Sequence, residues 1–237
     1  MKKILLVRLS SLGDVVHTFP AVTDIARHVP GVELHWAVDE LFAELPALHP
    51  AVSRVIPVAL RRGRRNPFNP ATWRALAELR ATLGATPYDT ILDLQGLLKS
   101  AVVARFAQGA RHGHAAATAR EPLAAWLYDH RHPAPRGDHA VAQTRGLAGA
   151  ALGYAVDGEI DYGLRVPTRP SFAPTARYAV LLHSTSRASK LWADDDWIAL
   201  GQRLDSADVR CACACLTAVP SSPPITRRMS SACRASN

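Results

Sequence analysis

Short apolar segments alternate with amphipathic ones over residues 2–152, and this alternation restricts the fold more than any other feature. Buried strands are expected at KKILLVRL (2–9), ELHWAVD (33–39), VSRVIPVAL (52–60) and YDTILDLQG (88–96). Helical spacing predicts helices at 14–28, 40–48, 70–83, 97–108, 121–130 and 139–152. Strands that alternate with helices in this way are parallel and joined by right-handed crossovers. The sequence therefore predicts an α/β domain with a doubly wound parallel sheet over residues 1–154.

Three polar or basic loops follow predicted strands. They are SSLGD (10–14), RRGRR (61–65) and DLQGLLKS (93–100). In doubly wound sheets, ligands bind at the carboxyl ends of the strands. Because all three loops fall at those ends, the sequence predicts one ligand site on this rim.

The loop SSLGD leaves two interpretations of Asp14 open. Gly13 permits close approach of a ligand to the backbone, and the loop opens a helix whose free N–H groups favour an anion. An aspartate at a helix start is commonly just an N-cap, whereas here it is also placed to do chemistry. The loop matches neither G-x-G-x-x-G nor the P-loop, which argues against a Rossmann-type oxidoreductase.

The basic residues on the rim also have two interpretations. RRGRR is either a solvated loop or a clamp on phosphates or carboxylates, which the guanidinium fork binds through two hydrogen bonds. Lys99 either pairs with an anion or extends from an exposed helix face to water. Arg120 precedes a helix start at Pro122, and it faces the same rim if the strand order allows.

A second α/β unit is expected after a proline-rich linker at 155–176. A strand begins at RYAVLLHSTS (177–186), and DDDW (194–197) opens a helix, so we assign an incomplete domain to residues 177–210. Its polar loop HSTSRASK (183–190) combines hydroxyls with cations. Such a loop suits a diphosphate, although an ordinary turn has the same composition.

Residues 211–237 have no aromatic and no acidic side chain, and they are rich in serine, proline and alanine. We interpret this low-complexity tail as aberrant or out-of-frame coding, which leaves the second domain incomplete. All four cysteines lie here, at positions 211, 213, 215 and 233. C-x-C-x-C resembles a metal motif only superficially, and because it lies in this low-complexity tail, no metal site is expected.

The charge balance points to anionic partners. The net charge is +8 and the pI about 9.8, with 6% aromatic residues and no aromatic-interleaved basic stripe, which argues against nucleic acid. No apolar run approaches the roughly 18 residues of a membrane span. Arg8 and Asp14 interrupt the N-terminal apolar run, so we expect no signal peptide and a cytoplasmic protein.

An ordered series of segments resembles a known family. The segments are VRLSSLGDVVHTFPAVTD, VSRVIPVALRRGRR, YDTILDLQGLLKSA, TAREPLAAWLYD, HAVAQTRGLAGAALGY and YAVLLHSTSRASKLWADDDW. They resemble the lipopolysaccharide heptosyltransferases of glycosyltransferase family 9, most closely those of type I, through most of residues 1–205. The resemblance implies a GT-B fold of two Rossmann-like domains. It also implies inverting transfer of L-glycero-D-manno-heptose from ADP-heptose to Kdo of the lipopolysaccharide inner core (Kdo2-lipid A). The place would be the inner face of the inner membrane, with no metal or other cofactor.

The resemblance also assigns residue roles. It makes Asp14 the catalytic base, and it places the donor diphosphate against Thr185, Ser186, Arg187 and Lys190. It places the anionic acceptor against Ser10, Ser11, Gly13, Arg61, Arg62, Arg64, Arg65, Gln95, Lys99 and Arg120. The family's later donor segment, D-T-G-x-x-H, is not among these 237 residues. We therefore expect little or no transfer from this chain. The alternative is a non-catalytic binder of an anionic lipopolysaccharide precursor.

Overall fold

The computed structural model describes residues 2–60, 69–133, 139–165, 177–182, 189 and 191–213. Residues 210–213 are described by their backbone alone. The chain divides into two compact units, Met1–Pro167 and Thr168–Asn237.

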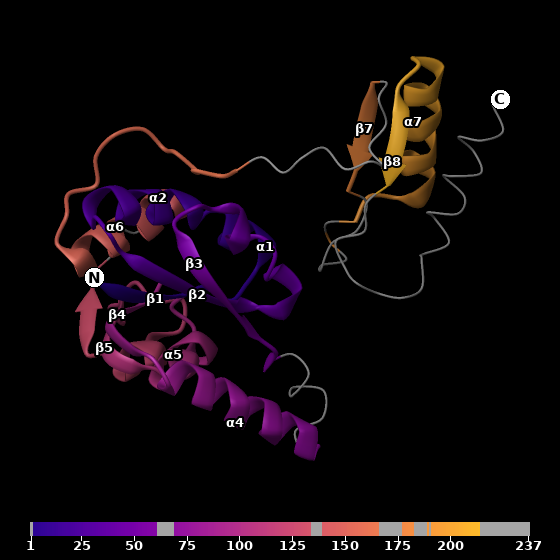
Figure 1. Cartoon of the computed structure of the whole chain (residues 1–237). Helices are drawn as coiled ribbons and strands as arrows, with labels where there is room; N and C mark the ends of the chain where they lie inside the picture. The colour runs from indigo at the N-terminus through magenta and orange to yellow at the C-terminus, as the bar shows by residue number, and fades with distance from the viewer. Residues whose placement is uncertain are drawn as a thin grey trace. The chain divides into compact units, whose positions relative to one another are not determined.

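Unit 1 contains a parallel sheet in the order β3-β2-β1-β4-β5-β6 (Figure 1). Its strands are β1 (Lys3–Val7), β2 (Glu33–Asp39), β3 (Val52–Val58), β4 (Pro87–Asp93), β5 (Gln108–His114) and β6 (His130–His132). In the central pairing, Ile4 to Val7 of β1 lie opposite Thr90 to Asp93 of β4. The order of strands reverses between β1 and β4, and such a switch point is where doubly wound sheets open a ligand crevice.

Helices cover both faces of this sheet. They are α1 (Leu12–Val16), α2 (Phe19–His28), α4 (Pro70–Gly84), α5 (Leu98–Arg105) and α6 (Ala140–Leu152). The 3-10 turns are η1 (Glu40–Phe42), η2 (Pro46–Leu48) and η3 (Pro122–Leu127). Helices α2 and α6 lie on one face, whereas α4 and α5 lie on the other (Figure 1). None of the helices within the described ranges is long and apolar enough to cross a membrane.

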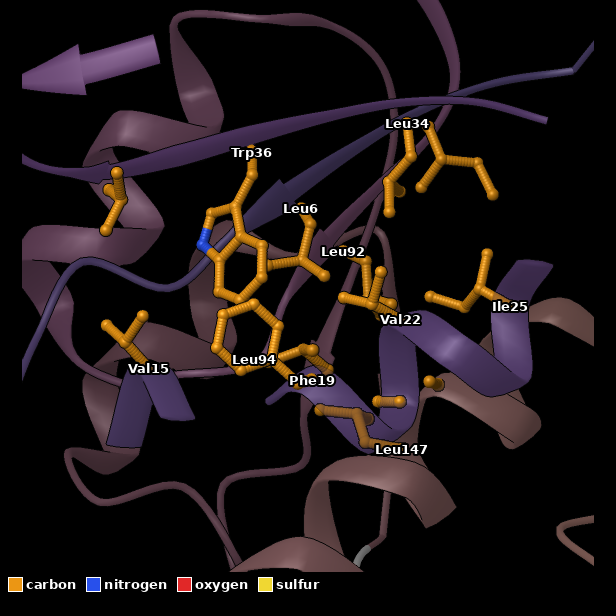
Figure 2. Packing of buried hydrophobic residues seen from close by; sticks show 14 residues of the cluster. Leu6, Val15, Phe19, Val22, Ile25, Leu34, Trp36, Leu92, Leu94 and Leu147 are labelled. Atoms are coloured by element: carbon orange, nitrogen blue, oxygen red, sulfur yellow. The ribbon is translucent and has the colours of Figure 1, made fainter. Parts of the chain in front are cut away.

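Two apolar clusters fix the central strands from either side. On the α2–α6 face, Phe19 meets Trp36 edge-on, with ring centroids 5.4 Å apart, and Leu147 of α6 closes the cluster (Figure 2). On the opposite face, Leu83 of α4 and Val103 of α5 pack in a second cluster. Successive side chains of β1 (KILLV) point alternately into the two clusters. Because both faces of the strand are buried, its sequence is a continuous apolar run.

Four predicted helices differ from the observed ones. The expected helix 14–28 is divided into α1 and α2 around Thr18, because Pro20 lies in the first turn of α2 and has no N–H to continue the ladder. The expected helix 97–108 ends at Arg105, and β5 follows it. The expected helix 121–130 is the turn η3, followed by β6. The predicted helix at 40–48 consists of the two short turns η1 and η2.

Unit 2 contains a β-α-β element of β7 (Tyr178–Leu181), α7 (Asp194–Ser206) and β8 (Arg210–Cys213). The two strands are parallel. Leu181 packs against Trp197 and Leu204 of α7. The three aspartates that open α7 favour its N-terminal dipole. The predicted bounds of the linker, the incomplete domain and the tail stay predictions.

Candidate active site

Four predicted site residues meet at the carboxyl end of the β1–β4 switch point. Asp14 belongs to α1, which follows β1, and Gln95 and Lys99 follow β4. Arg120 follows β5, the next strand outward. Hydrogen bonds join the segments that follow β1, β4 and β5, and they confirm the prediction that SSLGD and DLQGLLKS share one rim.

Asp14 is the third residue of α1, and Ser11 is the N-cap. The Asp14 carboxylate accepts from the Ser11 amide at 3.0 Å and from Ser11 Oγ at 3.2 Å, both at Oδ2. The N-cap interpretation is therefore wrong in position, because the side chain reaches back to the cap from inside the helix. This contact holds the first turn and orients the carboxylate.

Two guanidinium groups contact the same carboxylate. Arg120 donates to Oδ1 from Nη2 at 2.8 Å and to Oδ2 from Nη1 at 3.3 Å. Arg8 donates to Oδ1 from Nη2 at 3.2 Å. Burial raises the pKa of Asp14, but the hydrogen bonds from Arg120 and Ser11 and the charge of Arg8 outweigh it and lower this pKa to about 2. The carboxylate is therefore ionised at neutral pH.

Arg8 is a buried cation at the end of β1. Its Nη1 donates to the Leu94 carbonyl oxygen, so that the guanidinium bridges β4 and Asp14. Burial lowers the pKa of Arg8 to about 10, which still leaves the side chain charged at neutral pH. A buried charge of this kind is costly unless it is paired, and the pair with Asp14 supplies the counter-charge.

The loop between β4 and α5 is fixed by Asp93. Asp93 Oδ1 accepts from the backbone amides of Gln95 at 2.8 Å and Gly96 at 3.3 Å. Gly96 has a φ of +67°, a conformation that favours glycine. Gln95 Oε1 accepts from the Leu9 amide at 2.7 Å, so the loop is tied to the segment that precedes Asp14.

Lys99 completes the connection between the two loops. Its Nζ donates to Ser10 Oγ at 3.0 Å. An apolar pocket of about 660 Å³ adjoins this lysine and is lined also by Leu98, Val102 and Phe106. Lys99 and Glu121 are the charged residues among the lining of this otherwise apolar pocket, and a cation in such a lining suits an amphiphilic anion.

A small polar cavity of about 30 Å³ lies among Arg8, Gln95, His114 and Arg120. Burial, and then the charge of Arg8, lowers the pKa of His114 to about 4, so the imidazole is neutral at neutral pH. In the described part of the chain, no cluster of three His, Cys, Asp or Glu side chains could hold a metal ion. The expectation of no metal stays a prediction.

Part of the predicted site lies outside the described residues. This holds for the acceptor candidates Arg61, Arg62, Arg64 and Arg65 and for the donor candidates Thr185, Ser186, Arg187 and Lys190. The remaining candidates lie on the rim, namely Ser10, Ser11, Gly13, Asp14, Gln95, Lys99 and Arg120. Sequence reasoning missed the structural roles of Arg8, Asp93 and His114. The signal for Arg8 was a charge that ends a buried apolar strand.

Comparison with known proteins identifies the family. The model of glycosyltransferase family 9 (heptosyltransferase) matches residues 76–229. The lipopolysaccharide heptosyltransferase 1 of Pseudomonas aeruginosa is 43% identical over 204 residues, which cover 85% of this chain and 58% of that protein. The chain belongs to glycosyltransferase family 9. The Escherichia coli K12 protein of the same name is 41% identical over 211 residues, covering 88% of this chain and 66% of that one.

Solved family 9 structures agree with the fold. The structure of E. coli heptosyltransferase WaaC with ADP-2-deoxy-2-fluoro heptose matches with a TM-score of 0.84 and 38% identity, over 96% of this chain and 73% of that one. A family 9 glycosyl transferase from Veillonella parvula matches with a TM-score of 0.68 at 15% identity, which supports the fold alone. The predicted GT-B class, with a Rossmann-like first sheet and the start of a second, is confirmed.

The matched regions cover only part of the relatives' length but reach into the tail of this chain. This chain spans 58% of the length of the P. aeruginosa relative. The family model extends to residue 229 and so includes residues that we interpreted as an aberrant tail. That interpretation stays a prediction.

Proposed function

We propose that the chain takes part in the transfer of L-glycero-D-manno-heptose from ADP-heptose to Kdo of Kdo2-lipid A, with unit 1 holding the acceptor. One observation carries the proposal. The ionised carboxylate of Asp14 lies at the sheet's switch point and is paired with Arg120, and Lys99 binds Ser10 of the same loop. A base on a loop that also carries two cationic contacts suits an anionic acceptor that must lose a proton.

In this mechanism Asp14 is the general base. A sugar hydroxyl is a weak nucleophile at neutral pH and needs a base within about 3 Å as its bond forms. The hydroxyl proton passes to a carboxylate oxygen of Asp14 while the hydroxyl oxygen bonds to the anomeric carbon. The bond from that carbon to the ADP oxygen breaks on the opposite face, and ADP leaves with the electron pair. The anomeric configuration is therefore inverted.

The other predicted site residues would contact the donor or the acceptor. Thr185, Ser186, Arg187 and Lys190 would stabilise the charge that develops on ADP, which is already a good leaving group. This reaction needs no metal, so a chelator should leave its rate unchanged. On the acceptor side, Gln95, Lys99, Arg120 and the arginines of RRGRR would hold the anionic groups of the Kdo-lipid.

Mass spectrometry of the reaction tests the proposal. The chain is incubated for hours with ADP-heptose and Kdo2-lipid A, with and without a chelator. We expect heptosylated product at a low rate for these 237 residues, with inverted anomeric configuration by NMR of the isolated product, and loss of roughly 10²–10⁴-fold in Asp14→Asn. Rapid turnover would contradict the expected low rate, and a fully active Asp14→Asn would contradict the role of Asp14. Salt-sensitive acceptor binding without any product would favour the non-catalytic binder.

We also propose that the protein works in the cytoplasm at the inner face of the inner membrane. Large apolar side chains are exposed near Lys99. Leu98 and Val102 on α5 are about two-fifths exposed, and Leu123 and Trp126 on η3 are exposed by 67% and 79%. Helix α5 packs against η3, so these side chains belong to neighbouring elements. Together with the net charge of +8, such a surface suits an anionic bilayer.

Vesicle sedimentation tests this location. We expect binding to vesicles that contain phosphatidylglycerol, weakened by salt and by Trp126→Ser. The matched control is Leu41→Ser, because Leu41 on η1 is 52% exposed and belongs to a different part of unit 1. Equal binding by the two variants would contradict the assignment of the surface.

A further inference from the structure

The Asp14 carboxylate is saturated with hydrogen bonds. Oδ1 accepts from Arg8 at 3.2 Å and from Arg120 at 2.8 Å. Oδ2 accepts from the Ser11 amide at 3.0 Å, from Ser11 Oγ at 3.2 Å and from Arg120 at 3.3 Å. A carboxylate offers about four lone-pair positions, and these five contacts fill them. A base in this state has no oxygen open to the proton of an acceptor hydroxyl.

Of the two arginines that pair with Asp14, Arg120 is the exposed one. The side chain of Arg8 is 4% exposed and also bonds the Leu94 carbonyl oxygen, so it is fixed from two sides. Ser11 bonds Asp14 as part of the helix start. The side chain of Arg120, in contrast, is 52% exposed and comes from the loop after β5. Its departure opens a position on both carboxylate oxygens, and Arg8 and Ser11 keep the carboxylate in place.

We propose that Arg120 is a positioning residue that blocks Asp14 until an anionic group of the acceptor draws the guanidinium away. This inference rests on the proposed role of Asp14 as the base. A guanidinium binds carboxylate and phosphate in the same two-point geometry, so an incoming anion competes directly with Asp14 for the same donors. The arrival of the acceptor thus both fills the site and frees the base.

The exchange favours transfer of the sugar to the acceptor over hydrolysis of the donor. While Arg120 is bound to the Asp14 carboxylate, a water molecule that reaches the site finds no free carboxylate oxygen to take its proton. The sugar donor is therefore protected from hydrolysis in the absence of acceptor. The low pKa of Asp14 agrees with this arrangement, because the hydrogen bond from Arg120 is the largest of the contributions that lower it.

The pKa of the Asp14 carboxyl, measured by NMR on chain with ¹³C-labelled aspartate, tests the proposal without any need for turnover. Comparison with Asp14→Asn identifies the signal. We expect Arg120→Gln to raise this pKa by about one unit or more, and Arg120→Lys to raise it less. The matched control is Arg111→Gln, which removes a partly buried guanidinium that pairs with Asp129 and not with Asp14. An Asp14 pKa that is the same in Arg120→Gln as in the wild type overturns the proposal.

Added ligands then test the exchange. The methyl glycoside of Kdo supplies a carboxylate, its methyl ester lacks that charge, and inorganic phosphate supplies the other anion. Binding is followed at the Gly13 and Leu98 amides. We expect a bound anion to raise the Asp14 pKa in the wild type and to leave it unchanged in Arg120→Gln. Comparison of the Kdo glycoside with phosphate shows whether a carboxylate or a phosphate raises the Asp14 pKa. Saturable binding with an unchanged Asp14 pKa overturns the blocking role and leaves the proposed function standing. Absence of binding by the glycoside, by phosphate and by Kdo2-lipid A overturns both.

Discussion

Tyr128 donates a hydrogen bond from its hydroxyl to Asp93 Oδ2 at 2.7 Å, in the interior of unit 1. Burial raises the pKa of Asp93, and the Tyr128 hydroxyl is the first of the contacts that oppose this rise. The other oxygen of Asp93 holds the amides of Gln95 and Gly96. The position of the loop that carries Gln95 and Lys99 therefore depends on a buried carboxylate that the tyrosine helps to satisfy.

Tyr128→Phe should lower the free energy of unfolding by about 1–3 kcal/mol, because it leaves one oxygen of the buried Asp93 without this donor. Urea unfolding monitored by circular dichroism measures the change. The matched control is Tyr154→Phe. Tyr154 is a tyrosine of the same unit whose buried hydroxyl has no hydrogen-bond partner among the described residues, and its removal should cost little. Equal losses in the two variants would show that the Tyr128 hydroxyl contributes nothing specific.

Arg145→Leu should destabilise unit 1 by about 3–5 kcal/mol, because it leaves the buried carboxylate of Asp24 without its counter-charge. Arg145 Nε lies 2.6 Å from Asp24 Oδ2, and the two side chains are 7% and 4% exposed. The pair joins α6 to α2. The comparison variant is Arg27→Leu, which breaks an ion pair with Asp161 whose side chains are about half exposed. That variant should lose less than about 1 kcal/mol. Similar losses in both would contradict the role assigned to burial.

Unfolding free energies at several pH values should show a contribution from His114. Its pKa falls from about 6.5 in the unfolded chain to about 4 in the folded one, because the imidazole is buried. Between these values the unfolded chain binds more protons, so the stability from His114 is complete above pH 6.5 and is lost as the pH falls towards 4. The loss amounts to about 3 kcal/mol. His114→Leu should remove this part of the slope. An unchanged slope in the variant would contradict the burial of a neutral imidazole.

Gly13→Ala should leave the stability of the chain nearly unchanged and weaken acceptor binding. A Cβ at Gly13 would meet no atom within 4 Å, and the residue lies inside α1, where alanine is the better helix former. The added methyl group would instead occupy the space through which a ligand approaches Asp14. Thermal unfolding and calorimetric titration with Kdo2-lipid A measure the two effects. A fall in melting temperature that accounts for the loss of binding would make Gly13 a structural residue.

The central part of unit 1 could be predicted from sequence because its strands are apolar on both faces and its helices are amphipathic. Strand β5 could not, since QGARHGH is polar and glycine-rich, and its position depends on pairing with β4. The seam between strand and helix singled out Asp14 but left a helix cap and a chemical role open, and the role of base came from the family resemblance. Its guanidinium partners could not be predicted, because Arg120 lies 106 residues away in sequence and reaches Asp14 only through the strand order.

Acceptor binding to this rim is tested most directly by backbone amide chemical shifts, with deacylated Kdo2-lipid A as the ligand. We expect saturable shifts to concentrate at Ser11, Gly13, Gln95, Lys99 and Arg120, at the carboxyl ends of β1, β4 and β5. We also expect Lys99→Gln to weaken the binding. Shifts confined to other parts of unit 1, or binding of equal strength in Lys99→Gln and in the wild type, would contradict the assignment of this rim as the acceptor site.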